Sequence, residues 1–420
     1  MSKSKKVLVV GGGGRCHAIV DSLSRSERVG KIYCAPGNAG IAAQAECVPI
    51  QVADIPALLE FAKANEIDMT IVGPEASLAA GIVDAFREAG LKIFGPTKAA
   101  ARIESSKEYA KDLMTRHEVP TAAYRTFSDF DEALAYVKAG PIPVVIKYDG
   151  LAAGKGVVVA LTLAEAEDAL RDMLLDEAFG KGRVVVEEFL DGPEFSFMCI
   201  VNGNKLYPLD IARDHKRAYD HDAGPNTGGM GAYSPVPFVT PEIRRTALET
   251  ILQPVADAMV EEGVPFTGVL YGGLILHKGT PKVIEFNARF GDPETEVVLP
   301  RLKSDFYDLI EAAVEGRDFE TEWIPESVLG VVMAAKGYPG KYEKGHHVRG
   351  LDKVHDKVYH MGTAERDGRI LTVGGRVLMV LGHGKNLTEA RRAAYASLAE
   401  VDCPGLFNRT DIGSREACDI

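Results

Sequence analysis

The chain has 420 residues, 46 % hydrophobic and 26 % charged, which is an ordinary globular composition for about two to four domains. A formal net charge of −12 without a basic stripe argues against nucleic-acid binding. The sequence contains no run of about 18 apolar residues, so we expect no membrane-spanning helix. The six cysteines form no CxxC pair, and the basic start runs into a short strand rather than a signal peptide. We therefore expect free thiols and a cytoplasmic location.

Residues 1–103 form the expected first domain, in which residues 5–103 alternate short apolar runs with helical stretches. We expect strands at 6–10, 31–35, 47–50, 69–72 and 92–94, and helices at about 17–25, 55–65 and 78–89. Such alternation predicts a doubly wound parallel sheet, which binds ligands at the carboxyl ends of its strands. Glu75 follows one strand end and either faces that crevice or lies on the surface.

The first strand runs into four glycines and then a helix. A strand–glycine loop–helix turn can hold a phosphate on backbone N–H groups, which makes Gly11, Gly13 and Gly14 candidate binding positions. We expect Gly13 to need a positive φ. The loop does not match the dinucleotide fingerprint, because its third glycine position is Cys16, so a nicotinamide cofactor is disfavoured.

Residues 104–325 form the expected second domain, with a helix over 104–120 and a small α/β unit at about 121–189. Strands are expected at 144–147, 156–161 and 184–188, with a helix at 164–174. Lys147 closes one strand, and the loop that follows contains three glycines and a second lysine, namely Gly150, Gly154, Lys155 and Gly156. This pattern favours a hairpin that covers phosphates over an ordinary glycine hairpin, and it is not a Walker A loop.

Two later segments carry acidic and amide side chains. Glu187, Glu188 and Glu194 lie where a strand enters a turn, which could face an adenine and a ribose or simply be solvated. Glu285, Asn287 and Arg289 would share one face of a strand. An acid and an amide suit Mg²⁺ with phosphate oxygens, and Arg289 suits a phosphoryl group; a Glu285–Arg289 salt bridge is the alternative.

The remaining segments are less regular. Residues 214–235 are charged and then glycine-rich, which indicates a functional segment or disorder. Their buried-type residues Met230, Tyr233 and Pro235 argue against disorder. Residues 326–420 form a third, mixed α/β domain, with strands expected at 330–335, 357–362 and 376–382 and a helix at 387–401.

Taken in order, these segments resemble the phosphoribosylamine–glycine ligase family, or glycinamide ribonucleotide synthetases, of the ATP-grasp superfamily. The matching runs are spread over essentially the whole chain, at 13–15 with 17–18, 35–40, 72–76, 94–97, 149–156, 214–217, 224–235, and 285–287 with 289–295. One departure lies in the glycine loop, which usually reads Gly-Asn-Gly-Gly-Arg-Glu-His and here carries Gly12 and Cys16. The roles of those two side chains are therefore not carried over.

The resemblance implies an ATP-grasp core with a mobile lid between the two other domains. It implies ATP as co-substrate, Mg²⁺ or Mn²⁺ as metal, and glycine and 5-phosphoribosylamine as substrates of a monomer or small homo-oligomer. The product would be glycinamide ribonucleotide for purine synthesis, formed through glycyl phosphate. The rivals are another ATP-grasp ligase or carboxylase, a dinucleotide-dependent oxidoreductase, and a noncatalytic nucleotide-binding module.

The resemblance also assigns roles to individual residues. For ATP, Lys107 and Lys147 would bind the phosphates, and the loop 150–156 would cover them. The adenine would be lined by Glu187, Glu188 and Leu190, and Glu194 would hold the ribose. Glu285 and Asn287 would bind the metal, and Lys155, Arg289 and Asp214 would act in catalysis. Lys216, Asp292, Glu75 and the glycine loop would place the substrates, with the loop on the 5′-phosphate of phosphoribosylamine.

Overall fold

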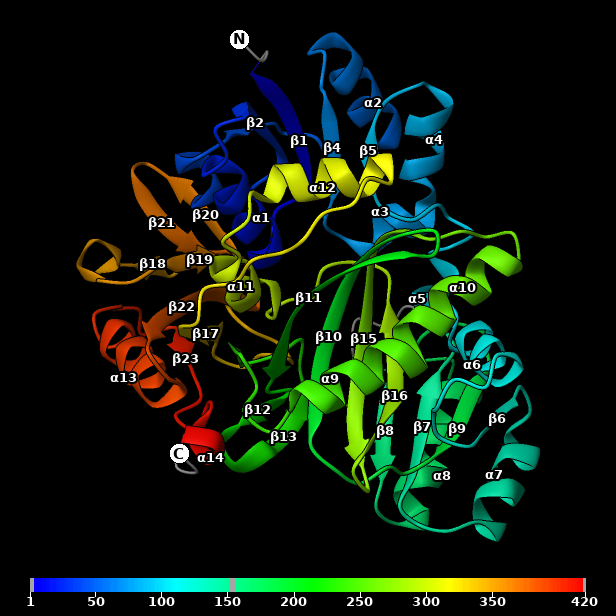
Figure 1. Cartoon of the computed structure of the whole chain (residues 1–420). Coiled ribbons are helices and arrows are strands. Elements are labelled where there is room, and N and C mark those ends of the chain that lie inside the picture. The colour runs from blue at the N-terminus through cyan, green and yellow to red at the C-terminus, as the bar shows by residue number, and fades with distance from the viewer. Residues whose placement is uncertain (1–3, 151–155, 418–420) are drawn as a thin grey trace.

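The computed structural model describes residues 4–150 and 156–417 (Figure 1). Three sheets organise the chain: an N-terminal parallel sheet, a small antiparallel sheet and a large sheet that runs through the centre. Among the described residues, no helix is long and apolar enough to cross a membrane. The predicted α/β class is confirmed.

The N-terminal sheet is parallel, as the sequence predicts. Its strand order is β3-β2-β1-β4-β5, with bounds Lys5–Gly11 (β1), Val29–Pro36 (β2), Glu46–Cys47 (β3), Met69–Val72 (β4) and Ile93–Phe94 (β5). The connecting helices are α1 (Gly14–Ser24), α2 (Ile55–Ala64), α3 (Glu75–Ala80) and α4 (Ile82–Glu88). The order reverses between β1 and β4, so the glycine loop and Glu75 lie at one crevice.

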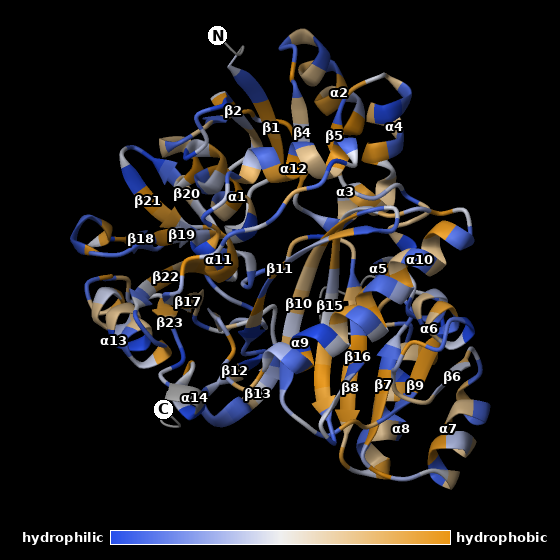
Figure 2. Cartoon of the chain, in the orientation of Figure 1, coloured by the Kyte–Doolittle hydropathy of each residue, from blue (hydrophilic) through white to orange (hydrophobic). Residues whose placement is uncertain are grey.

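The small sheet has the order β6-β9-β7-β8 and lies at the lower right of Figure 1. Its strands are Tyr124–Phe127 (β6), Val144–Tyr148 (β7), Val157–Ala160 (β8) and Val184–Glu188 (β9), and its helices are α7 (Phe130–Ala139) and α8 (Leu163–Leu174). Helix α8 begins with a capping box between Thr162 and Glu165. The unit has its own hydrophobic core, visible as the apolar strands β7 to β9 in Figure 2.

The large sheet joins the middle of the chain to its C-terminal part. The order is β16-β15-β10-β11-β14-β17-β22-β19, with β23 (Leu406–Phe407) paired to β17. The strands are Glu194–Asn202 (β10), Lys205–Asp214 (β11), Gly231–Ser234 (β14), Thr267–His277 (β15), Thr280–Asn287 (β16), Ser327–Ala335 (β17), Val358–His360 (β19) and Arg376–Gly384 (β22). Neighbouring strands along this order are antiparallel. Hydrogen bonding therefore continues from β16, which carries the predicted metal ligands, into the last 100 or so residues.

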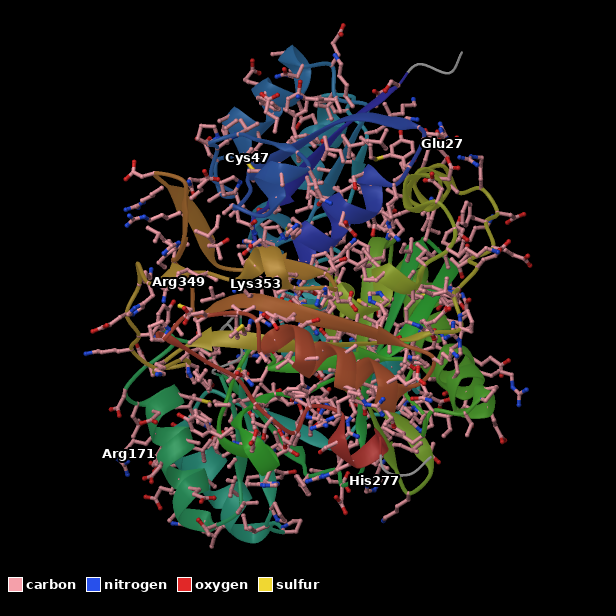
Figure 3. The ribbon with its side chains drawn as sticks, turned by 90° about the vertical axis from the view of Figure 1, so that its left-hand side faces the viewer. Glu27, Cys47, Arg171, His277, Arg349 and Lys353 are labelled. Atoms are coloured by element: carbon pink, nitrogen blue, oxygen red, sulfur yellow. The ribbon has the colours of Figure 1, made fainter. Side chains whose placement is uncertain are left out.

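The other helices and small ribbons of this part of the chain complete the fold. They are α5 (Arg102–Ser105), α6 (Lys107–Arg116), α9 (Pro241–Ala247), α10 (Gln253–Glu261), α11 (Thr295–Val298), α12 (Phe306–Glu315), α13 (Leu387–Leu398) and α14 (Ser414–Ala417), and the ribbons β12 (Arg217–Tyr219) with β13 (Ala223–Asn226) and β18 (His347–Val348) with β21 (Arg369–Thr372) and β20 (Thr363–Arg366). In the view of Figure 3, Arg349 and Lys353 of the C-terminal segment lie between Cys47 above and Arg171 of α8 below.

Several predicted boundaries are wrong, each for a local reason. The single helix expected at 78–89 is two helices, because Gly81 between them adopts φ +94. The helix expected over 104–120 is also split, because Ser106 is extended and its side chain caps α6 instead. Strand β3 ends at Cys47 rather than 50. Disorder at 214–235 is excluded, since β14 is fully buried in the large sheet.

Candidate active site

A group of lysines surrounds Glu285 near the end of β16. Lys147 comes from β7 of the small sheet, and its Nζ donates to the backbone oxygen of Ile284 at 2.8 Å, which brings the two sheets together. Burial works to raise the pKa of Glu285, but the charges of Lys216, Lys147 and Lys107 outweigh it and hold this pKa below its ordinary value. The carboxylate is thus ionised inside a cationic site.

Lys107 is fixed to the start of the glycine hairpin. Asp149 Oδ1 accepts hydrogen bonds from the backbone N of Lys107 at 2.6 Å and of Glu108 at 3.2 Å, which caps the N-terminus of α6. Lys107 Nζ donates to the Gly150 oxygen at 3.0 Å. The far end of the loop closes where Tyr148 N donates to the Gly156 oxygen at 2.8 Å. Gly154 and Lys155, predicted to cover phosphates and to act in catalysis, lie outside the described residues.

Glu187 balances two buried lysines. Its Oε2 lies 3.0 Å from Lys147 Nζ and 3.0 Å from Lys111 Nζ, and all three side chains are at most 4 % exposed. Lys111 also donates to Thr121 Oγ1 at 2.8 Å. The sequence reasoning missed Lys111, although it lies four residues after Lys107 and so on the same face of α6.

The other residues predicted to line the adenine and ribose differ in environment. Leu190 is buried against Ala122 and Ile275, whereas Glu188 is exposed and its backbone N donates to the Ala123 oxygen at 2.8 Å. Glu194 is paired with Lys216, with 2.7 Å between Oε2 and Nζ. The alternative of a solvated charge therefore holds for Glu188 and is wrong for the buried Glu187, whereas the Glu194 side chain is 44 % exposed but paired with Lys216.

A second acidic group lies beside Lys216. The pKa of Asp214 is raised to about 7, because burial and the charges of Glu294 and Glu194 together outweigh the lowering by Lys216. Glu294 is itself buried, and its Oε1 accepts from the hydroxyls of Tyr271 at 2.7 Å and Ser196 at 2.9 Å. The end of β11 and the residues just after it thus place an acid and a lysine against the same cluster.

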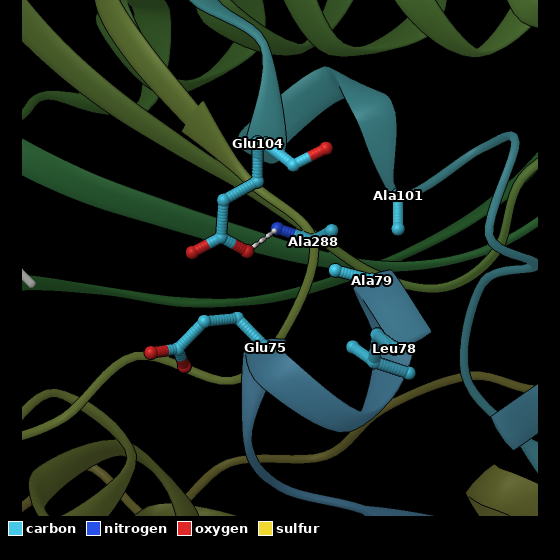
Figure 4. Close-up of a pocket in the computed structure, with 7 residues that line it drawn as sticks. Glu75, Leu78, Ala79, Ala101, Glu104 and Ala288 are labelled. Carbon is cyan, nitrogen blue, oxygen red and sulfur yellow. Dashed lines mark hydrogen bonds between the residues drawn. The ribbon is translucent and has the colours of Figure 1, made fainter. Parts of the chain in front are cut away.

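Arg289 does not pair with Glu285, so that alternative is wrong. Strand β16 ends at Asn287, and Arg289 turns away to Glu104, with 3.2 Å from NH2 to Oε1, and to Glu75, with 3.4 Å from Nε to Oε2. Glu104 Oε2 also accepts from Ala288 N at 2.8 Å. Figure 4 shows both carboxylates turned to one side of a narrow pocket. Glu75 is therefore a crevice residue rather than a solvated surface carboxylate.

Asp292 contacts two arginines beside the glycine loop. Its Oδ1 lies 2.8 Å from Arg376 NH2 of β22, and its Oδ2 accepts from Arg15 N at 3.3 Å. Arg15 also binds Glu75, with NH1 3.3 Å from Oε2. Ion pairs at this point connect the N-terminal sheet, the turn after β16 and the C-terminal segment.

The glycine loop is held by backbone geometry and by Asn38. Gly11 has φ +136, whereas Gly13 has φ −92, so the expectation of a positive φ at Gly13 is wrong. A Cβ at Gly12 would lie 2.5 Å from the Gly37 oxygen, but one at Gly13 would meet only Asp292 Oδ2, at 3.5 Å. The Asn38 amide donates to the oxygens of Gly12 and His360, each at 2.8 Å. The sequence reasoning did not single out Asn38.

The facing sheets and the lysines between them define an ATP-grasp enzyme. Models of phosphoribosylglycinamide synthetase match residues 5–104 (N domain), 105–295 (ATP-grasp (A) domain) and 328–415 (C domain). The chain belongs to the phosphoribosylglycinamide synthetase family.

Relatives and solved structures agree with this family. The chain is 53 % identical over 413 residues to the phosphoribosylamine–glycine ligase of Halalkalibacterium halodurans, covering 97 % of this chain and 96 % of that protein. The Vibrio parahaemolyticus ligase is 51 % identical over 420 residues, covering 98 % of each. The crystal structure of the Thermotoga maritima ligase has a TM-score of 0.86 at 33 % identity, covering 97 % of this chain and all of that one. Biotin carboxylase from Campylobacter jejuni, at 16 % identity and TM-score 0.74, shares the fold.

Lys111 gives a pH-dependent contribution to stability that can be measured. Burial lowers its pKa from 10.5 to about 8, so between these values the unfolded chain binds more protons than the folded one. The free energy of unfolding should then rise with pH over this window, by on the order of 3 kcal/mol, relative to Lys111→Met. Urea denaturation of both proteins at several pH values measures this difference.

Lys303→Met is the matched control, because Lys303 is exposed and its ion pair with Glu322 raises its pKa. Its difference from the parent should stay flat or fall slightly as pH rises. If the difference in unfolding free energy between the parent and Lys111→Met also stays flat with pH, the charged form of Lys111 is not destabilised by burial.

Proposed function

We propose that this chain joins glycine to 5-phosphoribosylamine with ATP, giving glycinamide ribonucleotide, ADP and phosphate in purine synthesis. The observation that carries the proposal is the cationic site around Glu285 in a chain matched by the family along its length. A site that keeps one carboxylate ionised among several lysines suits a metal-bound triphosphate.

For ATP, we assign the phosphates to Lys107, Lys147 and the hairpin from Gly150 to Gly156 that includes Lys155. Because the Glu187 carboxylate is occupied by two lysines, the adenine edge would meet the backbone near Glu187 and Glu188 together with the Leu190 side chain. Glu194 would break its ion pair with Lys216 and bind the ribose hydroxyls instead. Lys216 would then be free to bind another anion.

For the metal, Glu285 and Asn287 would supply two oxygen ligands to Mg²⁺ or Mn²⁺. The fit rests on donor chemistry: Glu285 is kept ionised, and the Asn287 Oδ1 lies 3.3 Å from Arg289 NH2, at the rim of the same site. A divalent ion there would neutralise charge on the transferring phosphoryl group. Arg289, held by Glu75 and Glu104, would add a fixed positive charge to the same region.

For glycine, we assign the ammonium group to Asp214 and the carboxylate to the Lys216 side. A carboxylate oxygen of glycine attacks the γ-phosphorus and releases ADP, which leaves glycyl phosphate. The amine of phosphoribosylamine attacks the acyl carbon, loses a proton, and expels phosphate. Exclusion of water by the small sheet and its hairpin would protect the acyl phosphate from hydrolysis.

For phosphoribosylamine, we assign the 5′-phosphate to the loop of Gly11, Gly13 and Gly14, with Asp292 and Glu75 orienting the ribosyl amine. We also propose three domains at 1–103, 104–325 and 326–420, with the lid at about 121–189. A monomer or small homo-oligomer in the cytoplasm is the proposed setting. The free thiols of Cys16, Cys34, Cys47, Cys199 and Cys403 support that location.

Release of ADP tests the proposed function against carboxylase, oxidoreductase and noncatalytic alternatives. We expect rapid ADP and phosphate formation only when glycine and phosphoribosylamine are both present, because each supplies one half of the new amide. A coupled ADP assay with either substrate omitted measures this. Equal turnover with bicarbonate or an unrelated carboxylate in place of glycine would refute the assignment.

Gly13→Val tests the division between the two ends of the site. Since φ at Gly13 is −92 and a Cβ there has space, the variant should fold normally and intrude only on the approach to the loop. The KM for phosphoribosylamine should rise about tenfold or more, while the Kd for ATP from calorimetry changes less than about twofold. Loss of ATP binding by folded Gly13→Val would instead make the loop a nucleotide site.

A further inference from the structure

Glu296 of α11 is a buried acid without a hydrogen-bond partner. Its side chain is 0 % exposed, and among the described residues neither carboxyl oxygen makes a hydrogen bond. Burying a polar group without a partner is costly, and native folds keep few such groups. A partner outside the protein chain is the simplest physical reason for retaining it.

The carboxyl group lies against the first turn of α1. A Cβ built on Gly14 would be 2.2 Å from Glu296 Oε1 and 3.0 Å from Met361 Cγ, so both side chains pack on this glycine. Helix α1 has 11 residues, and Gly13 at its N-cap supplies no side-chain hydrogen bond. The first-turn N–H groups of such a helix attract an anion. Glu296 therefore lies beside the anion-binding end of the glycine loop.

The nearby arginines are committed to other groups. Arg376 binds Asp292, with 2.8 Å between NH2 and Oδ1, and its NH1 donates to the Gly228 oxygen at 2.8 Å. Arg15 NH1 donates to the Gly73 oxygen at 2.9 Å as well as pairing with Glu75. Glu296 thus receives no direct ion pair from either arginine.

Asp292 and Glu296, four residues apart, have environments that favour opposite protonation states. Burial acts to raise the pKa of Asp292, but Arg376 and Arg15 outweigh it and lower this pKa. Burial raises the pKa of Glu296 well above its ordinary value, and the charge of Asp292 adds to the rise, against the charge of Arg376. Environments that separate two acids in this way give one anion and one O–H donor.

The remaining ionisable neighbours do not change this picture. Burial raises the pKa of the Cys16 thiol on α1 to about 12, and it raises that of Tyr359 on β19 well above its usual range. Both are therefore neutral near neutral pH. Arg376 stays charged, because the charge of Asp292 outweighs burial and raises its pKa.

We propose that Glu296, in its protonated form, donates a hydrogen bond to the anionic group of the substrate held at the first turn of α1. This inference rests on the function proposed above, under which that group is the 5′-phosphate of phosphoribosylamine. A neutral donor adds a hydrogen bond to the phosphate without a repelling charge, and the Asp292 carboxylate stays on the Arg376 guanidinium and the backbone N of Arg15.

Binding of ribose 5-phosphate, followed by calorimetry at about pH 7, tests this role in the full chain. Glu296→Gln keeps an N–H donor and should bind within about twofold of the parent. Glu296→Met fills the same space without a donor and should bind at least about tenfold more weakly. Removing an unpaired buried acid should leave the Met variant at least as resistant to heat as the parent, which a purely structural role would not predict. Glu296→Ala serves if the Met variant does not fold.

Glu311→Gln is the matched control, because Glu311 is another buried acid but pairs with Arg28 far from the loop. It should leave ribose 5-phosphate binding unchanged. Parent-like binding by both Glu296→Gln and Glu296→Met would overturn the proposal. Binding by Glu296→Gln that is about tenfold tighter would also overturn it, since this would show an ionised, repelling carboxylate.

The ligase assay separates this inference from the proposed function. If the parent joins glycine to phosphoribosylamine while Glu296→Met keeps its KM, the role of Glu296 fails and the function stands. If the parent does not turn over yet Glu296→Met loses ribose 5-phosphate binding, the function fails and the anion contact stands.

Discussion

The structure depends on one electrostatic constraint: the buried arginines at the centre must be matched by carboxylates from other segments. Arg289, after β16, is held by Glu75 of α3 and Glu104 of α5. Asp292 binds Arg15 of α1 and Arg376 of β22. Because a buried charge without its partner is strongly unfavourable, these pairs fix the N-terminal crevice, the end of β16 and the C-terminal segment in one arrangement.

The site proposed for the nucleotide obeys the same rule with different residues. Lys111 and Lys147 share the Glu187 carboxylate, and Lys107 is tied to the start of the hairpin through Asp149 and Gly150. The lysines to which we assign the phosphates are therefore already held in place by the protein itself. Charges fixed in advance need little reorganisation during phosphoryl transfer, and electrostatic stabilisation of this kind usually contributes more to catalysis than any other single effect.

The sequence predicts the elements whose pattern is local and leaves out the partners that come from far away. Strand β1 and the glycine loop follow from an apolar run and four glycines, and β16 follows from alternating side chains. In contrast, nothing near Glu296 in the chain indicates that it will lie against Gly14, some 280 residues earlier. Alternation of side chains predicts that Arg289 shares a strand face with Glu285. It does not show that β16 ends at Asn287, before Arg289.

Lys111 and Gly81 show the two kinds of missed signal. Lys111 carries a readable one, its four-residue spacing from Lys107, but only the fold shows that Glu187 lies opposite. Gly81 lies within an otherwise helical pattern, and only its positive φ in the folded chain shows that the helix breaks there. Long-range ion pairs and single backbone dihedrals are properties of the assembled structure rather than of sequence periodicity.

The central claim is that one site first phosphorylates the carboxylate of glycine and then passes the acyl group to the amine. Turnover with glycine whose carboxylate carries heavy oxygen tests this most directly, with mass spectrometry of the phosphate released. The account predicts that each phosphate contains one labelled oxygen, because the oxygen that attacks the γ-phosphorus stays on it when the amine displaces phosphate. Phosphate free of the label during normal amide formation would contradict it.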